Sequence, residues 1–227
     1  MANKPENEKH GQNVLKSLEE LEKRRKKLIN LTKEMIAAYE GSMYLVDIFT
    51  IGAVKRAIST ATGFILLVES WNMICARALL RMQIDTALRF SSAFLVQKPH
   101  DFVMKVLGGQ QINKLKDKDG KVMTDGYLVS KLAPEYSWLP VVYKNLSGYV
   151  HFSEHHLADS IEDINDESTT VSWAIKEKNT KFPESSWEEV VACFNESTDL
   201  FMKYLEGWII TKANPEIVTK NKKYTKN

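Results

Sequence analysis

The residues best suited to chemistry lie close together, in the segment YKNLSGYVHFSEHH from Tyr143 to His156. It holds three of the chain's five histidines, together with tyrosine, lysine, asparagine and serine side chains. On a helix, Tyr143, Ser147 and His151 stack at four-residue steps, and His155 follows four residues later. An unperturbed imidazole has a pKa of about 6.5, so His151 is a candidate for proton transfer near neutral pH.

Two interpretations of these histidines involve no catalysis. His151 and His155 have the i, i+4 spacing of two metal ligands on one helix face. The acid between them, Glu154, does not directly follow the first histidine as a zinc-protease motif requires, and no third ligand is indicated, so we predict no metal site. In the structural interpretation, His151 is buried and bound by a Tyr or Ser hydroxyl, while His155 and His156 lie on the surface.

A second charged group lies in the segment ARALLRMQIDTALRF. One aspartate and three arginines recur there at four-residue steps and form one stripe on a helix, here called the arginine ladder: Arg77, Arg81, Asp85 and Arg89. One aspartate cannot neutralise three arginines. The ladder is therefore either a structural network completed by an acid from another helix, such as Glu69 or Glu154, or a site that binds an anion, because guanidinium groups match phosphate and carboxylate geometry.

The segment KNLSGYVH, from Lys144 to His151, resembles a degenerate form of the motif of HEPN-type helical proteins. In that family an arginine and a polar residue, often asparagine, are followed after a few residues by histidine, late in a helical bundle. Asn145 and His151 match this pattern, whereas Lys144 stands where the family has arginine and supplies charge without a bidentate fork. The pairing of ARALLRMQID with LSGYVH also resembles bacterial helical proteins of unassigned function.

The HEPN resemblance implies a metal-independent ribonuclease that acts as a dimer, with a role in RNA processing, toxin systems or phage defence. It implies that His151 transfers a proton, that Lys144 holds the phosphate together with Arg77 or Arg81, and that Asn145 orients the reacting group. Two other functions stay open. One is a non-enzymatic helical interaction or scaffold protein, and the other is a sensor that binds a small anionic ligand through Arg77, Arg81 and Arg89.

The elements that must position these residues are helices. The chain has 227 residues, of which 44% are hydrophobic, and its ten glycines and six prolines are few for a turn-rich β protein. A first helix is predicted over 13–39, and its apolar seam follows a heptad-like spacing: Val14, Leu18, Leu21, Leu28 and Met35. After candidate breaks at Gly52 and Gly63, one continuous apolar helix is predicted over 64–96.

Together these patterns predict an all-α helical bundle that forms a single domain over 12–212. A disordered segment is expected over 1–11 and a basic flexible tail over 213–227. A helix over 135–150 carries the histidine segment, and a long final helix follows Pro183. The segment TTVSWAIKEKNTKF, rich in β-branched and aromatic residues, predicts a small β-hairpin over 169–182.

The composition and the motifs of the chain restrict which classes of partner and cofactor are expected. A formal net charge of +2 gives no global argument for nucleic acid. Cys75 and Cys193 lie in apolar helical patterns and are interpreted as small buried hydrophobes, and no glycine-rich phosphate loop is present, so no cofactor is expected. Neither a secretion signal nor a membrane span is recognised, and a cytoplasmic location is expected. The expected partners are a second copy of the chain, another protein on the 14–39 helix, and RNA or a small anion.

Overall fold

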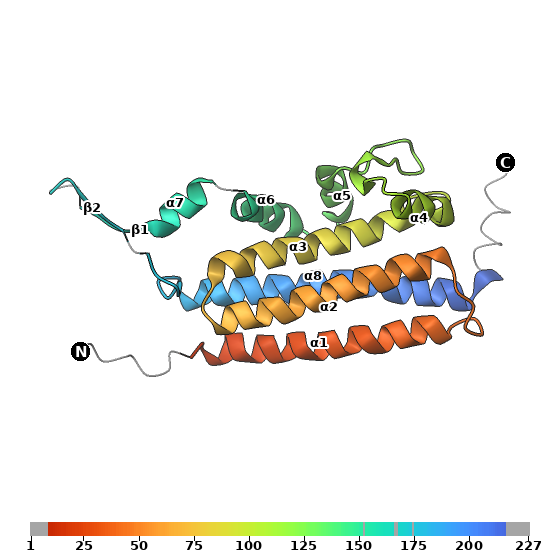
Figure 1. Cartoon of the computed structure of the whole chain (residues 1–227), viewed down its shortest axis with the longest axis horizontal. Coiled ribbons are helices and arrows are strands. Elements are labelled where there is room, and N and C mark those ends of the chain that lie inside the picture. The colour runs from red at the N-terminus through yellow and green to blue at the C-terminus, as the bar shows by residue number, and fades with distance from the viewer. Residues whose placement is uncertain (1–8, 152, 166–167, 174, 217–227) are drawn as a thin grey trace.

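The fold is built on four long helices that enclose one core (Figure 1). The computed structural model describes residues 9–151, 153–165, 168–173 and 175–216. The long helices are α1 (Gln12–Ala37), α2 (Leu45–Glu69), α3 (Met73–Ser91) and α8 (Glu184–Ala213). α1 packs against α8 and α2, and α3 packs against α2 and α8. The predicted all-α bundle is confirmed.

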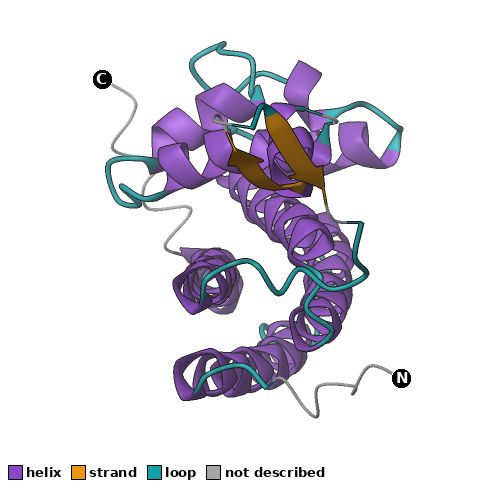
Figure 2. Cartoon of the chain, turned by 90° about the vertical axis from the view of Figure 1, so that its left-hand side faces the viewer, coloured by secondary structure: helices purple, strands orange, loops and turns teal. Residues whose placement is uncertain are grey.

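Shorter elements gather on one side of the bundle, as the nearly end-on view in Figure 2 shows. In chain order they are the 3₁₀ helix η1 (Ser92–Phe94), α4 (Pro99–Leu107), the 3₁₀ helix η2 (Ile112–Lys114), α5 (Asp125–Leu132), α6 (Leu139–Val150) and α7 (Glu154–Ser160). Two antiparallel strands follow, β1 (Ile161–Asn165) and β2 (Thr170–Trp173). Of these elements, α5 and α6 pack on α3, so α3 connects the core to the histidine segment.

The apolar seam of α1 forms part of the core, as predicted. All five members are at most 5% exposed: Val14, Leu18, Leu21, Leu28 and Met35. Arg25, a polar interruption at the same helical phase, donates from Nη1 to Thr62 Oγ1 on α2 at 2.7 Å. Because α8 and α2 of the same chain cover the seam, a protein partner of this helix would have to use its other face, where Leu15, Ile29 and Ile36 are exposed.

The predicted continuous helix over 64–96 is wrong, because the chain turns sharply inside it. α2 ends at Glu69 and α3 begins at Met73, with Trp71 between them in the left-handed region at a φ of 62°. The Asn72 side chain caps α3 by accepting a hydrogen bond from the backbone N–H three residues later, at 3.0 Å. The turn reverses the chain, so α2 and α3 pack side by side.

The two glycines proposed as breaks do not interrupt α2. Gly52 and Gly63 both lie inside this helix. A Cβ atom added at Gly63 would lie 3.1 Å from Leu79 Cδ1 on α3, which is closer than an ordinary contact. The absence of a side chain at Gly63 therefore serves the close approach of α2 and α3 rather than a turn.

The small β-hairpin is confirmed, but it begins earlier in the chain than expected. Its strands pair with Ile164 opposite Val171, and only β2 falls within the predicted segment 169–182. The first strand has the sequence IEDIN, in which two β-branched isoleucines are outnumbered by Glu, Asp and Asn, residue types that are depleted in strands. Its identity as a strand comes from pairing with β2 and not from its own composition.

Parts of the expected disordered segment and of the expected tail lie outside the described residues, namely 1–8 and 217–227. Within the described part, His10 is buried, and its Nε2 lies 2.7 Å from the Val68 carbonyl oxygen. Its ring stacks on Trp71 with 3.8 Å between ring centroids. His10 therefore attaches the chain before α1 to the turn between α2 and α3.

A buried ion pair joins the ends of three long helices. Lys212 Nζ lies 2.9 Å from Asp47 Oδ2, and both side chains are 0% exposed. The ammonium also donates to the Met35 carbonyl at 2.7 Å. The indole N–H of Trp208 donates to Asp47 Oδ1 at 2.7 Å, and the backbone N–H of Tyr44 donates to Oδ2 at 2.8 Å. These bonds satisfy both charges, as burial of an ion pair requires.

Among the described residues, α2 is the one helix long and apolar enough to cross a membrane by length and composition. A single helix of this kind is weak evidence of a membrane span, because a core helix passes the same test. The packing of α2 against α1 and α3 fits the role of a core helix.

Candidate functional site

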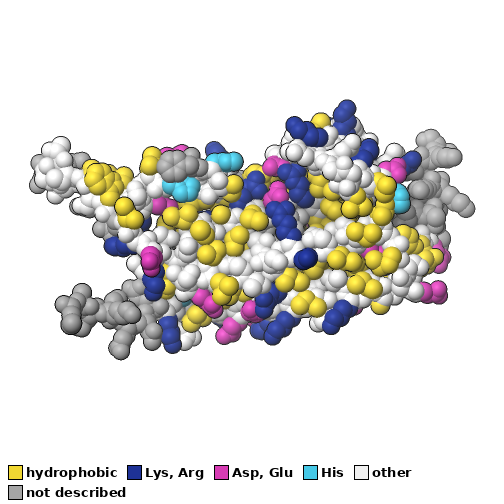
Figure 3. Space-filling model, in the orientation of Figure 1, with side chains coloured by type: hydrophobic (Ala, Val, Ile, Leu, Met, Phe, Trp, Pro, Cys, Tyr) yellow, Lys and Arg dark blue, Asp and Glu magenta, His cyan; other side chains and the backbone are white. Residues whose placement is uncertain are grey.

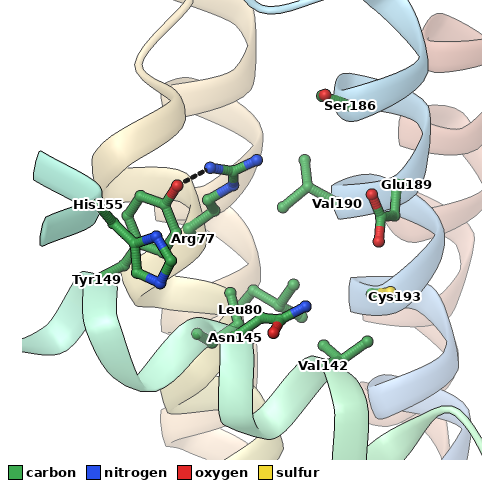
Figure 4. Close-up of a pocket in the computed structure, with 11 residues that line it drawn as sticks. Arg77, Leu80, Val142, Asn145, Tyr149, His155, Ser186, Glu189, Val190 and Cys193 are labelled. Atoms are coloured by element: carbon green, nitrogen blue, oxygen red, sulfur yellow. Dashed lines mark hydrogen bonds between the residues drawn. The ribbon is translucent and has the colours of Figure 1, made fainter. Parts of the chain in front are cut away.

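A pocket of about 290 Å³ lies where α3, α6, α7 and α8 meet (Figure 4). Its polar lining comes from all four helices: Arg77, Asn145, Tyr149, His155, Ser186, Glu189 and Cys193. Its apolar lining consists of four aliphatic side chains: Leu80, Val142, Leu146 and Val190. Figure 4 shows Arg77 and Tyr149 on one side and Glu189 and Cys193 on the other. Polar groups that converge on a concave site with aliphatic walls can fix the orientation of a small molecule.

Arg77 is the cation of this pocket. Its Nη1 donates a hydrogen bond to the Tyr149 hydroxyl, and its guanidinium carbon lies 4.5 Å from the centroid of that ring. Phe182 covers it further, with 4.9 Å between the guanidinium carbon and the ring centroid. None of the ion pairs among the described residues includes Arg77, in contrast to Arg81 and Arg89. Its charge is therefore available to an anion that enters the pocket.

His155 supplies the imidazole of the pocket through a tight turn between α6 and α7. Its ring stacks on Tyr149, with 5.2 Å between centroids and 7° between planes. Ser153 caps α7, accepts from the His155 backbone N–H at 3.3 Å, and donates to the Gly148 carbonyl at 2.9 Å. A Cβ atom at Gly148 would overlap His155 Cδ2 and lie 2.9 Å from Nε2. Only glycine at this position allows the imidazole to lie against α6.

Both tyrosines that contact the arginine ladder stay protonated at neutral pH. Burial raises the pKa of Tyr149, although Arg77 acts in the opposite direction, and nearby Asp159 raises it further. Burial also raises the pKa of Tyr143 well above its usual range, against the opposing effect of Arg81. A protonated Tyr149 accepts the hydrogen bond from Arg77, and its own O–H can donate to nearby Asp159 or to an anion that enters the pocket.

The remainder of the arginine ladder forms a structural network with a second acid. Asp85 Oδ1 lies 3.3 Å from Arg89 Nε and 3.9 Å from Arg81 Nη1. Asp125, at the start of α5, pairs with Arg89 and lies 3.7 Å from Arg81. The completing acid is therefore Asp125. The acids suggested by the sequence form no ion pair with the ladder: Glu69 and Glu154.

Mixed basic and acidic side chains appear at the middle of the face shown in Figure 3. This surface separates two yellow, apolar regions of the same face. Arg56 on α2 also pairs with Asp85, at 3.4 Å, so three arginines share two aspartates, and both Arg81 and Arg89 already have carboxylate partners without a ligand. Of the three ladder arginines proposed to bind an anion, Arg77 is the one that lines the pocket and forms no ion pair among the described residues.

The structure brings some of the predicted site residues together and leaves others apart. The segments of the arginine ladder and of the histidines do converge, since Tyr143 and Tyr149 contact Arg81 and Arg77. Asn145 and Arg77 line the same pocket, together with the predicted supporting residue His155. The remaining predicted residues on this segment are exposed and do not line it: Lys144, Ser147 and His151.

Sequence reasoning missed the part of the pocket that α8 contributes. Ser186, Glu189 and Cys193 follow one another at steps of three and four residues, which places them on one helix face. That spacing was available in the sequence, but it does not indicate which helix this face meets. Tyr149 was missed as well, although it lies on the same helix as the predicted Tyr143; the two hydroxyls contact Arg77 and Arg81, successive members of the ladder.

Among the described residues, no group of three or more His, Cys, Asp or Glu side chains is arranged to hold a metal ion. Comparison with known proteins assigns no family to the chain. No family model matches it, and no curated protein or solved structure matches it either. The chemistry of the pocket alone carries the functional inference.

Proposed function

We propose that this protein binds a small organic anion in the pocket between α3, α6, α7 and α8, and that Arg77 holds its carboxylate or phosphate group. The observation that carries the proposal is the guanidinium of Arg77, which lies among aromatic rings without a carboxylate partner in the described chain. A guanidinium binds such anions through charge-assisted hydrogen bonds. The Tyr149 hydroxyl and the Asn145 amide supply further donors to the pocket.

The rest of the lining restricts the ligand further. Leu80 and Val190 offer apolar contact to the body of the ligand. Glu189, which faces Arg77 across the pocket in Figure 4, repels a second negative group and favours a hydrogen-bond donor or an amine. The expected ligand has an anionic group at one end, an apolar body, and a donor at the other end. This proposal keeps the hypothesis that the protein is a sensor of a small anionic ligand. Of the three arginines named in that hypothesis, it retains Arg77 alone as the residue that binds the anion.

The rate at which the Cys193 thiol is alkylated can report whether a ligand occupies the pocket. Burial raises the pKa of its thiol to about 11, and Glu189 and Glu196 add to the effect. Since the thiolate is the reactive form, alkylation of Cys193 should accelerate about tenfold per pH unit between about pH 8 and 10, without levelling off. Cys75, the other cysteine of the chain, is exposed, so its predicted burial is wrong, and it is expected to label first, which makes it an internal control.

Phenyl phosphate and benzoate, which carry an anion on an apolar body, should slow alkylation of Cys193 and leave that of Cys75 unchanged. Arg77→Ala should weaken this protection about tenfold or more, because a hydrogen bond to a charged group contributes roughly 1.5–3 kcal/mol. Lys55→Ala, on the exposed surface of α2, removes the same charge and should keep the protection. Full protection in Arg77→Ala, or none in the unaltered protein, would contradict the proposal.

A second candidate function is the metal-independent RNA cleavage implied by the HEPN resemblance. The exposure of Lys144, Asn145 and His151 favours it, because groups that act on a polymer must be accessible from solvent. RNA cleavage in the presence of a chelator should fall by about 100-fold or more in His151→Ala. His100→Ala, a change at an exposed histidine on α4, is the matched control. An unchanged, nonzero rate in His151→Ala would remove His151 from catalysis.

The scaffold function, the homodimer and the cytoplasmic location stay predictions. The exposed apolar residues on the outer face of α1 support an interaction with another protein: Leu15, Ile29 and Ile36. Single exposed apolar side chains are common on protein surfaces, so they favour this function less than the pocket favours ligand binding.

A further inference from the structure

A second hollow, of about 400 Å³, lies beyond the C-terminal end of α3, between η1, α4 and η2. It shares no lining residue with the Arg77 pocket. Four lysines line it, here called the lysine hollow: Lys98, Lys105, Lys114 and Lys116. Their side chains are exposed, and in Figure 3 basic side chains gather over the part of the molecule that carries α4 and α5.

The charges of the lysine hollow are poorly balanced. Asp101 is the one acid in the lining, so four lysines against one aspartate leave a net charge of +3 (4 − 1). Lys98 Nζ lies 3.8 Å from Asp101 Oδ2, and both side chains are largely exposed. The other three lysines take part in no ion pair among the described residues. Like charges around one concave surface repel each other, and a multiply charged anion would relieve that repulsion.

Backbone structure holds the four lysines around the hollow. Lys98 directly precedes α4 and Lys105 lies in the last turn of that helix, while Lys114 ends η2. Lys116 forms an isolated antiparallel bridge with Val122. The segment after η2 is also tied to the end of η1, because the backbone N–H of Lys118 donates to the Leu95 carbonyl at 3.0 Å. The lysines therefore come from ordered backbone and not from one flexible loop.

We propose that the lysine hollow binds a compact polyphosphate, that is, several phosphate groups in a row. An ammonium group is a compact charge that suits single phosphate oxygens, and three unpaired ammonium groups can reach successive phosphates. The concave shape favours a compact ligand over a duplex. Phe102, the one aromatic residue in the lining, is buried, so the hollow offers no platform on which bases of a nucleic acid would stack.

The phosphate groups can come from free inorganic polyphosphate or from the tail of a nucleotide. The chemistry is the same in both cases, because the lysines contact phosphate oxygens alone. No glycine-rich phosphate loop is present in the sequence, so the proposal concerns binding and includes no hydrolysis step. It is independent of the small-anion pocket, and either proposal can fail without the other.

Calorimetric titration of the full chain with inorganic tripolyphosphate tests the proposal. Lys105→Glu combined with Lys114→Glu should weaken binding about 30-fold, because the charge of the lysine hollow falls by four units and becomes negative. Lys26→Glu combined with Lys33→Glu makes the same change in net charge on exposed positions of α1 and should weaken binding less than about threefold. Equal loss in the two double variants, or no binding to the unaltered protein at low salt, would overturn the proposal. Equal melting temperatures show that both variants fold.

Titrations with nucleotides distinguish the two sources of phosphate, free polyphosphate and the tail of a nucleotide. ATP that binds as tightly as tripolyphosphate supports recognition of phosphates alone, whereas tighter binding of ATP supports a nucleotide. AMP, with one phosphate, should bind at least about tenfold more weakly than ATP. A single-stranded RNA that binds tightly and that tripolyphosphate cannot displace would overturn the assignment to a compact ligand.

Discussion

Replacing Lys212 by methionine is expected to lower the free energy of unfolding by about 3–5 kcal/mol. Its ammonium lies 2.9 Å from Asp47 Oδ2 in a site with no solvent exposure. Without that ammonium, the Asp47 carboxylate keeps the indole N–H of Trp208 and the backbone N–H of Tyr44 as donors, but no compensating positive charge. Unfolding in guanidinium chloride, followed by circular dichroism, measures the loss.

Two further variants distinguish the cost of leaving a buried charge unpaired from the cost of losing any lysine side chain. Lys203→Met makes the same substitution on α8, where Lys203 pairs with Glu135 and both side chains are more than half exposed. It should change stability by less than about 1 kcal/mol. Adding Asp47→Asn to Lys212→Met removes the unpaired charge and should restore a large part of the loss. A cost below about 1 kcal/mol for Lys212→Met alone would contradict this account of the ion pair.

The ion pair and the proposed ligand pocket lie in different parts of the bundle. Asp47 stands at the start of α2 and Lys212 at the end of α8, whereas the pocket uses the first half of α3 and the first third of α8. Lys212→Met should therefore lower stability and leave protection of Cys193 intact under conditions where the protein stays folded. Arg77→Ala should remove the protection and cost less stability than Lys212→Met, because it breaks one hydrogen bond and two cation–π contacts but leaves no carboxylate without its ion-pair partner.

The buried face of α1 was predictable, because the spacing of the apolar residues along this helix is enough to define that face. The predicted helix over 64–96 failed because apolar periodicity does not reveal a residue in the left-handed conformation. Trp71 adopts that conformation at the end of α2, and no local preference of tryptophan requires it. The signal for the turn was Asn72, a good helix N-cap, which stands just before the first turn of α3.

The candidate site was partly predictable, because residue spacing shows which side chains share a helix face but not which other helix that face meets. Four-residue spacing correctly placed the arginine ladder on one stripe, but Asp125 joins it only through tertiary packing of α5 on α3. The helix predicted over 135–150 was expected to end at Val150, and the four-residue step from His151 to His155 holds only if that helix continues. In the structure α6 ends at Val150, and the chain turns at Ser153. The turn carries His155 back against α6 and leaves His151 exposed at the helix end.

Replacing Gly148 by alanine is expected to push His155 out of the pocket and to destabilise the protein by about 1–3 kcal/mol. The added Cβ would overlap His155 Cδ2 and lie 2.9 Å from Ser153 Oγ, the atom that caps α7. Both the stacking of His155 on Tyr149 and the start of α7 should be lost. Histidine ring signals in NMR spectra report the displacement, and faster alkylation of Cys193 reports the opened pocket.

Gly207→Ala is the matched control for this prediction, because Gly207 also lies inside a helix but a Cβ there would meet no atom within 4 Å. Alanine at that exposed position should stabilise the protein by about 0.5–1 kcal/mol, since glycine is the poorer helix former. The two identical substitutions are thus expected to have opposite signs. If Gly148→Ala left both the His155 signals and the stability unchanged, α7 would not be held against α6 as described, and His155 would no longer count as part of the ligand pocket.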